Sequence, residues 1–155
     1  DKLTADIALK AAQTGHLVLS TLHTNSAAQT LTRLLQMGIE RYHIASAITL
    51  IIAQRLVRRL CPHCRKQDFP PPELNISHSY LASEQGCANC QRGYHGRVAL
   101  YEMLFMTPAI VAAVLRGAHA LELENLAMVE GMQTLKQSGF NKVAEGLTTL
   151  TEVLR

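Results

Sequence analysis

Hydrophobic and polar positions at the start of the chain predict a helix followed by a buried strand. Residues 6–12 are rich in alanine, and their helical pattern ends at Thr14 and Gly15, which is typical of a helix end. Residues 17–22 are mostly apolar and lack the regular polar alternation of a half-exposed strand. They therefore predict an interior strand of a parallel sheet, with a loop starting at His23.

Two further helices and a second strand are predicted next. Asn25 or Ser26 can cap a helix whose apolar side chains lie on one face and which ends at Gly38. A second helix is predicted for residues 39–53 and a strand for residues 55–60. The apolar stretch inside this second helix is far shorter than the ~20 residues that cross a bilayer, so we expect it to be buried in protein.

The second half of the chain predicts one more strand and a helical tail. Three consecutive prolines place an irregular loop at residues 69–73, and residues 93–96 predict a turn. Residues 97–104 predict a strand, which we expect to pair with residues 55–60. Pro108 begins a helical region that is interrupted by glycines and continues to the C-terminus. Together these patterns indicate an α/β fold.

The composition fits one domain with a small appendage. With 155 residues, 48% of them hydrophobic, the chain can bury one core. Charged residues make up 17%, below the usual quarter or so, and we expect some apolar surface to be covered by another domain or subunit. The sequence begins with Asp1 instead of Met and has no signal-peptide pattern, so we expect a piece of a longer cytoplasmic protein.

The four cysteines stand as two close pairs, Cys61 with Cys64 and Cys87 with Cys90. Two residues inside each pair let both thiolates face one cation, and two such pairs complete the tetrahedral shell that Zn²⁺ prefers. Two disulfides, or four unrelated buried thiols, are the alternatives. Four thiolates leave no open coordination position, so a zinc ion here stabilises the fold without performing chemistry. The functional site is then expected elsewhere in the chain.

A cluster of basic residues flanks the first cysteine pair. Five of the 15 basic residues fall between positions 55 and 66: Arg55, Arg58, Arg59, Arg65 and Lys66. Such a cluster can contact nucleic-acid phosphates or form a solvated rim beside a metal site. A zinc-ribbon module that binds nucleic acid is thus an alternative function. Aromatic residues make up only 5% of the chain and tryptophan is absent, which disfavours base stacking.

Three polar residues, His23, Thr24 and Asn25, follow the predicted strand at its C-terminal end. Ligands of open α/β sheets bind beyond the C-terminal ends of the strands. An imidazole there can hydrogen-bond a phosphate or a water, and the backbone N–H groups of the following helix add positive potential. A purely structural histidine is the alternative. His16 lies at the other end of the predicted strand, about 23 Å away, so the two histidines are not expected to share a ligand atom.

Many short motifs resemble those of the type II secretion and type IV pilus assembly ATPases. The histidine box of this family is similar to residues 4–25, above all to Thr14-Gly15-His16-Leu17-Val18 and Ser20-Thr21-Leu22-His23-Thr24-Asn25. The resemblance continues through Arg33-Leu34, Met37-Gly38, Gln54-Arg55-Leu56, Arg59-Leu60-Cys61, Gly86-Cys87, Gly93-Tyr94, Gly96-Arg97, Tyr101-Glu102, Gly131-Met132, Thr134-Leu135, Lys142-Val143, Thr148-Thr149-Leu150 and Glu152-Val153. It covers nearly all of the 155 residues apart from the proline loop.

This resemblance implies an architecture and a biological role. Residues 1–60 are implied to be the C-terminal half of a RecA-like P-loop NTPase domain, residues 61–96 a tetracysteine zinc subdomain, and residues 97–155 a strand plus a helical C-terminal tail. The full-length protein is implied to be a homo-hexamer at the cytoplasmic face of the inner membrane. There it hydrolyses ATP with Mg²⁺ to drive pilus or pseudopilus assembly, with an inner-membrane platform as a partner. The zinc subdomain resembles the assembly branch, since the retraction motors lack it.

The same resemblance assigns site residues. By position, His23 matches the family histidine near the nucleotide phosphates, and its implied catalytic role is to sense or stabilise the γ-phosphate charge. Thr24 and Asn25 are implied to lie at the nucleotide beside it. Asp1 resembles the last residue of the family's acidic strand-end motif and is implied to belong to the nucleotide site as well.

Departures from the family pattern leave a second alternative open. No Gly-x-x-x-x-Gly-Lys-Ser/Thr motif occurs in the 155 residues, so this chain alone is expected not to hydrolyse ATP. Leu3 stands where the family usually has glutamate, and Thr151 replaces another acidic residue. A degenerate, non-catalytic scaffold of the secretion machinery is therefore the alternative to an active motor.

Overall fold

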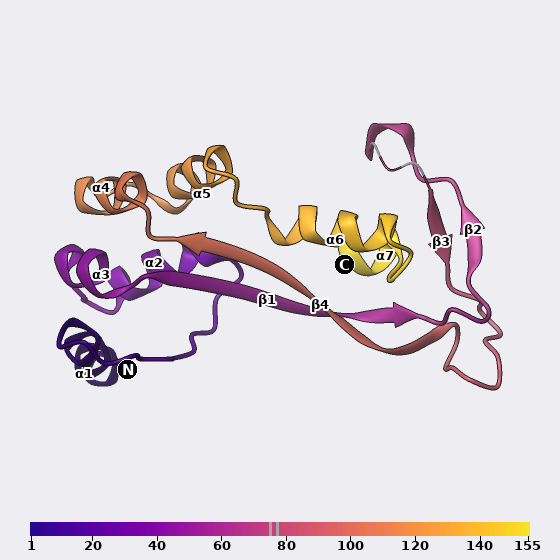
Figure 1. Cartoon of the computed structure of the whole chain (residues 1–155), viewed down its shortest axis with the longest axis horizontal. Coiled ribbons are helices and arrows are strands. Elements are labelled where there is room, and N and C mark those ends of the chain that lie inside the picture. The colour runs from indigo at the N-terminus through magenta and orange to yellow at the C-terminus, as the bar shows by residue number, and fades with distance from the viewer. Residues whose placement is uncertain (75, 77) are drawn as a thin grey trace. The chain divides into compact units, whose positions relative to one another are not determined.

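The computed structural model describes residues 1–74, 76 and 78–155. Its elements in chain order, all but η1 labelled in Figure 1, are α1 (Lys2–Gln13), α2 (Ala27–Gln36), α3 (Arg41–Ala47), β1 (Leu50–Leu60), β2 (Lys66–Asp68), the 3-10 helix η1 (Pro72–Leu74), β3 (Ser79–Leu81), β4 (Tyr94–Phe105), α4 (Pro108–Arg116), α5 (Ala120–Val129), α6 (Leu135–Ala144) and α7 (Leu150–Leu154). The α/β class predicted from the sequence is confirmed.

The chain divides into two compact units. The first combines Asp1–Ala53 with Glu102–Met132, and the second combines Gln54–Tyr101 with Gln133–Arg155. The boundary between the units falls within both β1 and β4. The sequence predicted three consecutive parts, residues 1–60, 61–96 and 97–155, whereas each compact unit combines two separate stretches of the chain. The functional roles assigned to those three parts stay predictions.

The two long strands pair with each other. β1 and β4 form a two-stranded sheet, and their arrows point in opposite directions in Figure 1. The predicted pairing of residues 55–60 with residues 97–104 is therefore confirmed. Both strands are longer than predicted, because β1 begins at Leu50 and β4 begins at Tyr94.

Buried apolar faces of three helices form the core of the first unit. The cluster combines α2, α4 and α5 with single residues of α3, β1 and β4 and of the turn after α2: Ala27, Ala28, Leu31, Leu34, Ile39, Ile44, Ile51, Leu104, Ile110, Ala113, Val114, Leu123 and Ala127. α2 is capped by Ser26, whose hydroxyl accepts the Gln29 N–H at 3.3 Å, and Gly38 follows its end with a φ of 83°. The helix predicted to end at Gly38 is thus confirmed, with Ser26 as the cap.

The first helix is also confirmed. The helix predicted at residues 6–12 is α1, which begins earlier than predicted and ends before Thr14 and Gly15 as expected. Its N-terminus is capped by Asp1, whose carboxylate accepts the Thr4 N–H at 2.8 Å. The earlier start follows from this cap, because Asp1 satisfies a backbone donor that the helix leaves free.

The strand predicted at residues 17–22 is wrong for the described chain. This segment has no regular secondary structure, and the side chains of Leu17 and Leu19 are 89% and 88% exposed. An interior strand is buried because neighbouring strands bond to both of its edges. Among the described residues, no strand pairs with this segment. The apolar pattern shows that residues 17–22 could lie inside a sheet. It does not show whether neighbouring strands are present to pair with them.

The helix predicted at residues 39–53 is wrong in its second half. α3 ends at Ala47, and β1 begins at Leu50. The boundary region contains Ile48 and Thr49, whose β-branched side chains favour a strand over a helix. The Met106 N–H then donates to the Thr49 carbonyl at 3.0 Å, next to the β1–β4 pair. Among the described residues, no helix is both long and apolar enough to span a bilayer.

A short hairpin between the cysteine pairs was not predicted. β2 and β3 are antiparallel, with Lys66 opposite Leu81 and Asp68 opposite Ser79. The loop predicted at residues 69–73 is only partly irregular, because its last two residues begin η1. A proline fits the first turn of such a helix, where its missing N–H costs no hydrogen bond.

The turn before β4 lies two residues earlier than predicted. Gln91 and Tyr94 exchange two backbone hydrogen bonds of 2.9 and 3.0 Å, so the turn covers residues 91–94. Gly93 has a φ of 79°, and a Cβ there would lie 2.5 Å from the backbone N of Ser83. Glycine is therefore required for two reasons: the left-handed backbone and the close approach of another segment.

The predicted helical tail is confirmed as four helices. α4 begins at Pro108 after the cap Thr107, and it ends at Gly117 with a φ of 88°. α5 follows in the first unit, and α6 and α7 lie in the second. α6 starts with a capping box between Thr134 and Gln137.

An ion pair ties α7 to β1 within the second unit. The guanidinium of Arg58 donates to Glu152 at 2.7 Å, and the Arg58 backbone N–H donates to the same carboxylate at 3.0 Å. The Glu152 side chain is only 8% exposed, whereas that of Arg58 is 50% exposed. The hydrogen bond from Arg58 lowers the pKa of Glu152 more than burial raises it.

We predict that Glu152→Gln destabilises the chain by about 1 kcal/mol near pH 7, since charged hydrogen bonds count for more than neutral ones but Arg58 is half exposed. Because the pKa of Glu152 is lowered by folding, its contribution is complete above the unfolded value of about 4.3 and is lost as the pH falls through the folded value. Denaturant unfolding of both proteins between about pH 7 and about pH 3, which extends below the unfolded pKa, measures this difference.

The matched control for this prediction is Glu145→Gln. Glu145 pairs with Lys142 on the surface of the second unit, where its side chain is 49% exposed. This variant is expected to stay close to wild type at every pH, because exposed ion pairs contribute little. A stability loss for Glu152→Gln that does not change with pH would show that the charge of Glu152 is not its source.

Candidate functional site

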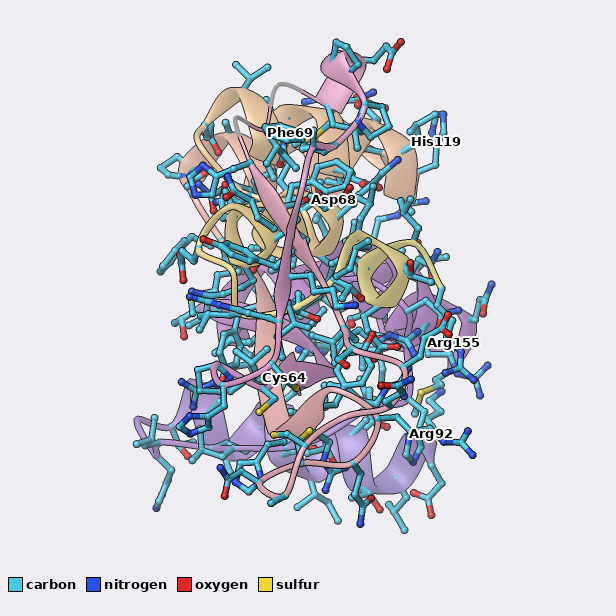
Figure 2. The ribbon with its side chains drawn as sticks, turned by 90° about the vertical axis from the view of Figure 1, so that its right-hand side faces the viewer. Cys64, Asp68, Phe69, Arg92, His119 and Arg155 are labelled. Atoms are coloured by element: carbon cyan, nitrogen blue, oxygen red, sulfur yellow. The ribbon has the colours of Figure 1, made fainter. Side chains whose placement is uncertain are left out.

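The four cysteines converge on one point in the second unit. All four Sγ atoms lie within 4.8 Å of one another, and Figure 2 shows sulfur atoms gathered near the labelled Cys64. Separations of 3.7 Å for Cys61 and Cys87, and of 3.6 Å for both Cys64–Cys90 and Cys87–Cys90, define the cluster. Cys61 is buried and the other three are half-buried.

These separations fit a four-thiolate metal site. Zinc–sulfur bonds of about 2.3 Å in a tetrahedron place the sulfurs about 3.8 Å apart. A disulfide requires an S–S distance of about 2.05 Å, and all four thiols are free. Of the alternatives that the sequence left open, two disulfides and four unrelated thiols both disagree with this geometry. The spacing of the two pairs thus predicted the cluster correctly.

Backbone contacts hold both pairs in place. Cys61 follows β1 directly, and its N–H donates to the carbonyl of Gly93 at 2.8 Å, beside the turn that opens β4. In the second pair, the Cys87 N–H donates to the sulfur of Cys90 at 3.2 Å. Gly86 precedes this pair with a φ of 70°, and a Cβ there would lie 3.1 Å from the backbone N of Arg92. The paired strands and two tight turns therefore set the position of the sulfurs.

The thiol hydrogen bonds separate the pKa values of the cysteines. Burial, aided by hydrogen bonds among the thiols, raises the pKa of Cys64 to about 12. Burial also acts on Cys90, but the Cys87 N–H and the thiols of Cys64 and Cys87 outweigh it and lower the pKa of Cys90 to about 7. Since thiolate is the ligating form, a metal that binds here displaces the remaining thiol protons.

Arg58 and Arg65 of the basic cluster make internal contacts in the second unit. Arg58 pairs with Glu152 and stacks over the Tyr94 ring at 4.0 Å. Arg65 donates to the carbonyl of Gly146 at 2.6 Å and lies over the Tyr80 ring at 4.2 Å. The two arginines therefore stabilise the fold around the cysteine cluster, which leaves less of the basic cluster for nucleic-acid phosphates.

An open cleft of about 680 Å³ lies in the second unit, and Arg58 of the basic cluster lines it. It is lined by Arg58, Gln91, Arg92, Tyr94, Gly96 and Arg97, all from β1, β4 or the turn that precedes β4. The charged residues in its lining are all arginines. One of them, Arg58, is already paired with Glu152, so its charge is partly neutralised.

The predicted nucleotide-binding residues belong to the first unit and make local contacts. Asp1 caps α1. His23 and Asn25 are exposed, and Thr24 shares a 2.8 Å hydrogen bond with the hydroxyl of Thr30 in α2. Asp1 and Thr24 therefore each contact their own helix, and the role of all four residues at a nucleotide stays a prediction.

His16 lies at the end of α1. Its Nδ1 is 3.2 Å from the Thr14 hydroxyl and 3.3 Å from the Ala11 carbonyl. The expected separation of about 23 Å from His23 assumed a strand at residues 17–22, so it loses its basis along with that strand. The contacts that His16 makes are to α1 and to the residue that follows it.

The start of α2 differs from the expectation that its N–H groups face a phosphate. The Ala27 N–H donates to the carboxylate of Glu102 at 2.7 Å, and the Gln29 N–H donates to the Ser26 hydroxyl. Two of the first three donors of the helix are thus satisfied by the chain itself. Glu102 had no predicted role, although a glutamate between the apolar residues Leu100 and Leu104 is the signal that would have identified it.

A family described as "Type II/IV secretion system protein" matches residues 1–155. The chain belongs to this family. The resemblance seen in the sequence is therefore confirmed over the full length of the chain.

Relatives of known name agree with this assignment. "Type IV pilus assembly ATPase PilB" of Pseudomonas aeruginosa is 47% identical over 164 positions, which cover 100% of this chain and 29% of that protein. "Protein transport protein HofB homolog" of Escherichia coli is 51% identical over 159 positions, covering 100% and 34%. "Type II secretion system protein E" of Klebsiella pneumoniae is 40% identical over 163 positions, covering 100% and 32%. The chain spans about a third of the length of these relatives.

A solved member of the wider group has a similar structure. The crystal structure of the pilus retraction motor PilT with bound ADP has a TM-score of 0.67 and 27% sequence identity. The similarity covers 99% of this chain and 36% of that one. The chain is thus similar to family members named for pilus assembly and to one named for retraction.

We predict that the chain binds one zinc ion and that Cys87→Ser with Cys90→Ser abolishes binding, because half of the ligands are removed. Elemental analysis of the purified proteins measures the metal content. Chelation of wild type should lower the melting temperature, since the metal closes the 22-residue loop at positions 65–86. The His63→Ala variant is the control: His63 is exposed within the first pair, and its removal should leave zinc content unchanged. Zinc lost with His63 would show a different ligand set.

Proposed function

We propose that this chain is part of a cytoplasmic ATPase that drives assembly of a type IV pilus or a type II secretion pseudopilus. The observation that carries the proposal is the family match over residues 1–155, together with relatives at 47% and 40% identity that are named for these two processes. Within that protein the chain supplies the C-terminal half of a RecA-like NTPase domain, a zinc subdomain and a helical tail.

The tetracysteine cluster supports assembly over retraction. The family resemblance implies that such a cluster belongs to the assembly and secretion branch, and four Sγ atoms within 4.8 Å suit a structural zinc. Zinc holds the segment between the two pairs as a closed loop. A metal with four thiolate ligands takes no part in ATP hydrolysis, so its function is to keep this subdomain folded.

His23 is the proposed catalytic residue of this chain. It is exposed, and it lies four positions before α2 with Thr24 tied to that helix by a hydrogen bond. An imidazole held in this way can donate a hydrogen bond to the γ-phosphate oxygens as charge shifts during hydrolysis. Asn25 and Asp1 are proposed to lie at the same nucleotide, which binds with Mg²⁺.

The proposed full-length assembly is a homo-hexamer at the inner membrane, where it works with a membrane platform. Exposed apolar side chains support a surface that other parts of such an assembly cover, because Leu17 and Leu19 are 89% and 88% exposed. A degenerate scaffold is the second candidate. Leu3 favours it, since it stands where the family pattern has glutamate.

We predict that the 155-residue chain alone does not hydrolyse ATP, because it contains no Gly-x-x-x-x-Gly-Lys-Ser/Thr motif to hold the phosphates. Phosphate release by the purified chain should equal the buffer background. The full-length protein, assayed in parallel, is the positive control and separates an active motor from a scaffold. Turnover by the chain itself that a second purification cannot remove would contradict the prediction.

For the full-length protein we predict that His23→Ala lowers kcat about 10-fold to 1000-fold, the usual effect of losing one transition-state hydrogen-bond donor. The matched variant is His16→Ala, which removes the contacts at the end of α1 and should lower stability or alter assembly first. Steady-state kinetics, thermal melting and light scattering on both variants measure these effects. Equal kcat losses with unchanged melting and assembly would show that the two histidines share one role.

A further inference from the structure

Glu102 places a carboxylate in the core of the first unit. Its side chain belongs to β4 and is 2% exposed. Two residues further along, Leu104 lies on the same face of the strand and is completely buried. A carboxylate in such surroundings is unfavourable unless hydrogen bonds compensate for the lost water. The position therefore calls for a specific partner.

One partner of this carboxylate is the first backbone N–H of α2. The Glu102 Oε1 accepts the Ala27 N–H at 2.7 Å, across 75 residues of sequence. This distance is typical of a strong, charge-assisted hydrogen bond. Negative charge is also favourable at a helix N-terminus, where the aligned peptide dipoles leave a partial positive charge. Glu102 thus fixes the place in the core at which α2 begins.

The start of α2 in turn fixes the residues before it. Residues 15–24 have no helix or strand of their own, and Ala27 is only four positions after His23. The contact between Thr24 and Thr30 leads back to the same first turn of α2. The backbone of residues 23–26 therefore leads directly into Ala27, whose N–H is bound to the Glu102 carboxylate.

We propose that Glu102 is a positioning residue for ATP hydrolysis, which holds the first turn of α2 so that His23 meets the nucleotide phosphates. This inference rests on the proposed function of His23. Glu102 itself touches no nucleotide: it acts through the Ala27 N–H and the backbone of residues 23–26. It also offsets the positive end of α2, so attraction of the phosphates depends on the side chains of the preceding segment and less on the helix dipole.

The test uses two substitutions in the full-length protein. Glu102→Leu keeps a side chain of similar volume in the core but removes the acceptor for the Ala27 N–H. Glu102→Gln keeps an acceptor oxygen at the same position. We expect Glu102→Leu to lower kcat about 10-fold or more, because small displacements of reacting groups have large effects on rate. Glu102→Gln should restore most of the loss.

Two further measurements separate positioning from a general loss of stability. Hydrogen exchange of the peptide that covers the first turn of α2 should accelerate in Glu102→Leu and return toward wild type in Glu102→Gln, while exchange in α4 stays unchanged. In a His23→Ala background, Glu102→Leu should cause no further loss of kcat, because both act through the same group. Glu40→Leu is the control: Glu40 is exposed in the same unit and its side chain makes no capping hydrogen bond.

The outcomes distinguish this proposal from the function on which it rests. If His23→Ala lowers kcat but Glu102→Leu does not, the positioning role of Glu102 is wrong and the role of His23 stands. Additive losses in the double variant, or unchanged exchange at α2, would also overturn the positioning role. If Glu102→Leu lowers kcat and His23→Ala does not, the proposed role of His23 is wrong, and with it the route through which Glu102 was inferred to act.

Discussion

The pairing of β1 with β4 is the constraint on which both units depend. In the second unit it brings the end of β1 to the start of β4, so that Cys61 meets Gly93 and the two cysteine pairs close on one point. In the first unit the other end of β4 carries Glu102, which holds the first turn of α2. Segments more than 25 residues apart in the sequence become neighbours only because these strands pair.

Local signals in the sequence were sufficient for most helices and for the cysteine cluster. Serine and threonine caps, glycines with positive φ and the Pro108 start mark helix ends through contacts within a few residues. The two cysteine pairs work in the same way, because their spacing suits one cation. These features could be predicted since their physical causes lie within one turn of the chain or are fixed by ligand chemistry.

Features that depend on distant partners could not be predicted. An apolar run such as residues 17–22 looks the same whether neighbouring strands are present or absent. Ile48 and Thr49 are β-branched, which favours a strand only weakly. The contact beside them comes from Met106, just after β4, whose N–H donates to the Thr49 carbonyl, and no local pattern shows this partner. Glu102 is the clearest case: its partner is 75 residues away, so only the folded chain reveals why a carboxylate is buried.

The hairpin between the two cysteine pairs has a practical consequence for labelling. Its base is held by the cysteine cluster and by Arg65, which contacts Gly146 and Tyr80. Phe69, just beyond β2, is 79% exposed. When the ends of a loop are already fixed, lengthening it costs little. Each doubling of the loop length raises the entropic free-energy cost of closing the loop by only about 0.6 kcal/mol. A short epitope or dye-binding peptide inserted beside Phe69 should therefore leave the rest of the chain folded, which gives a place to attach a reporter for single-molecule observation.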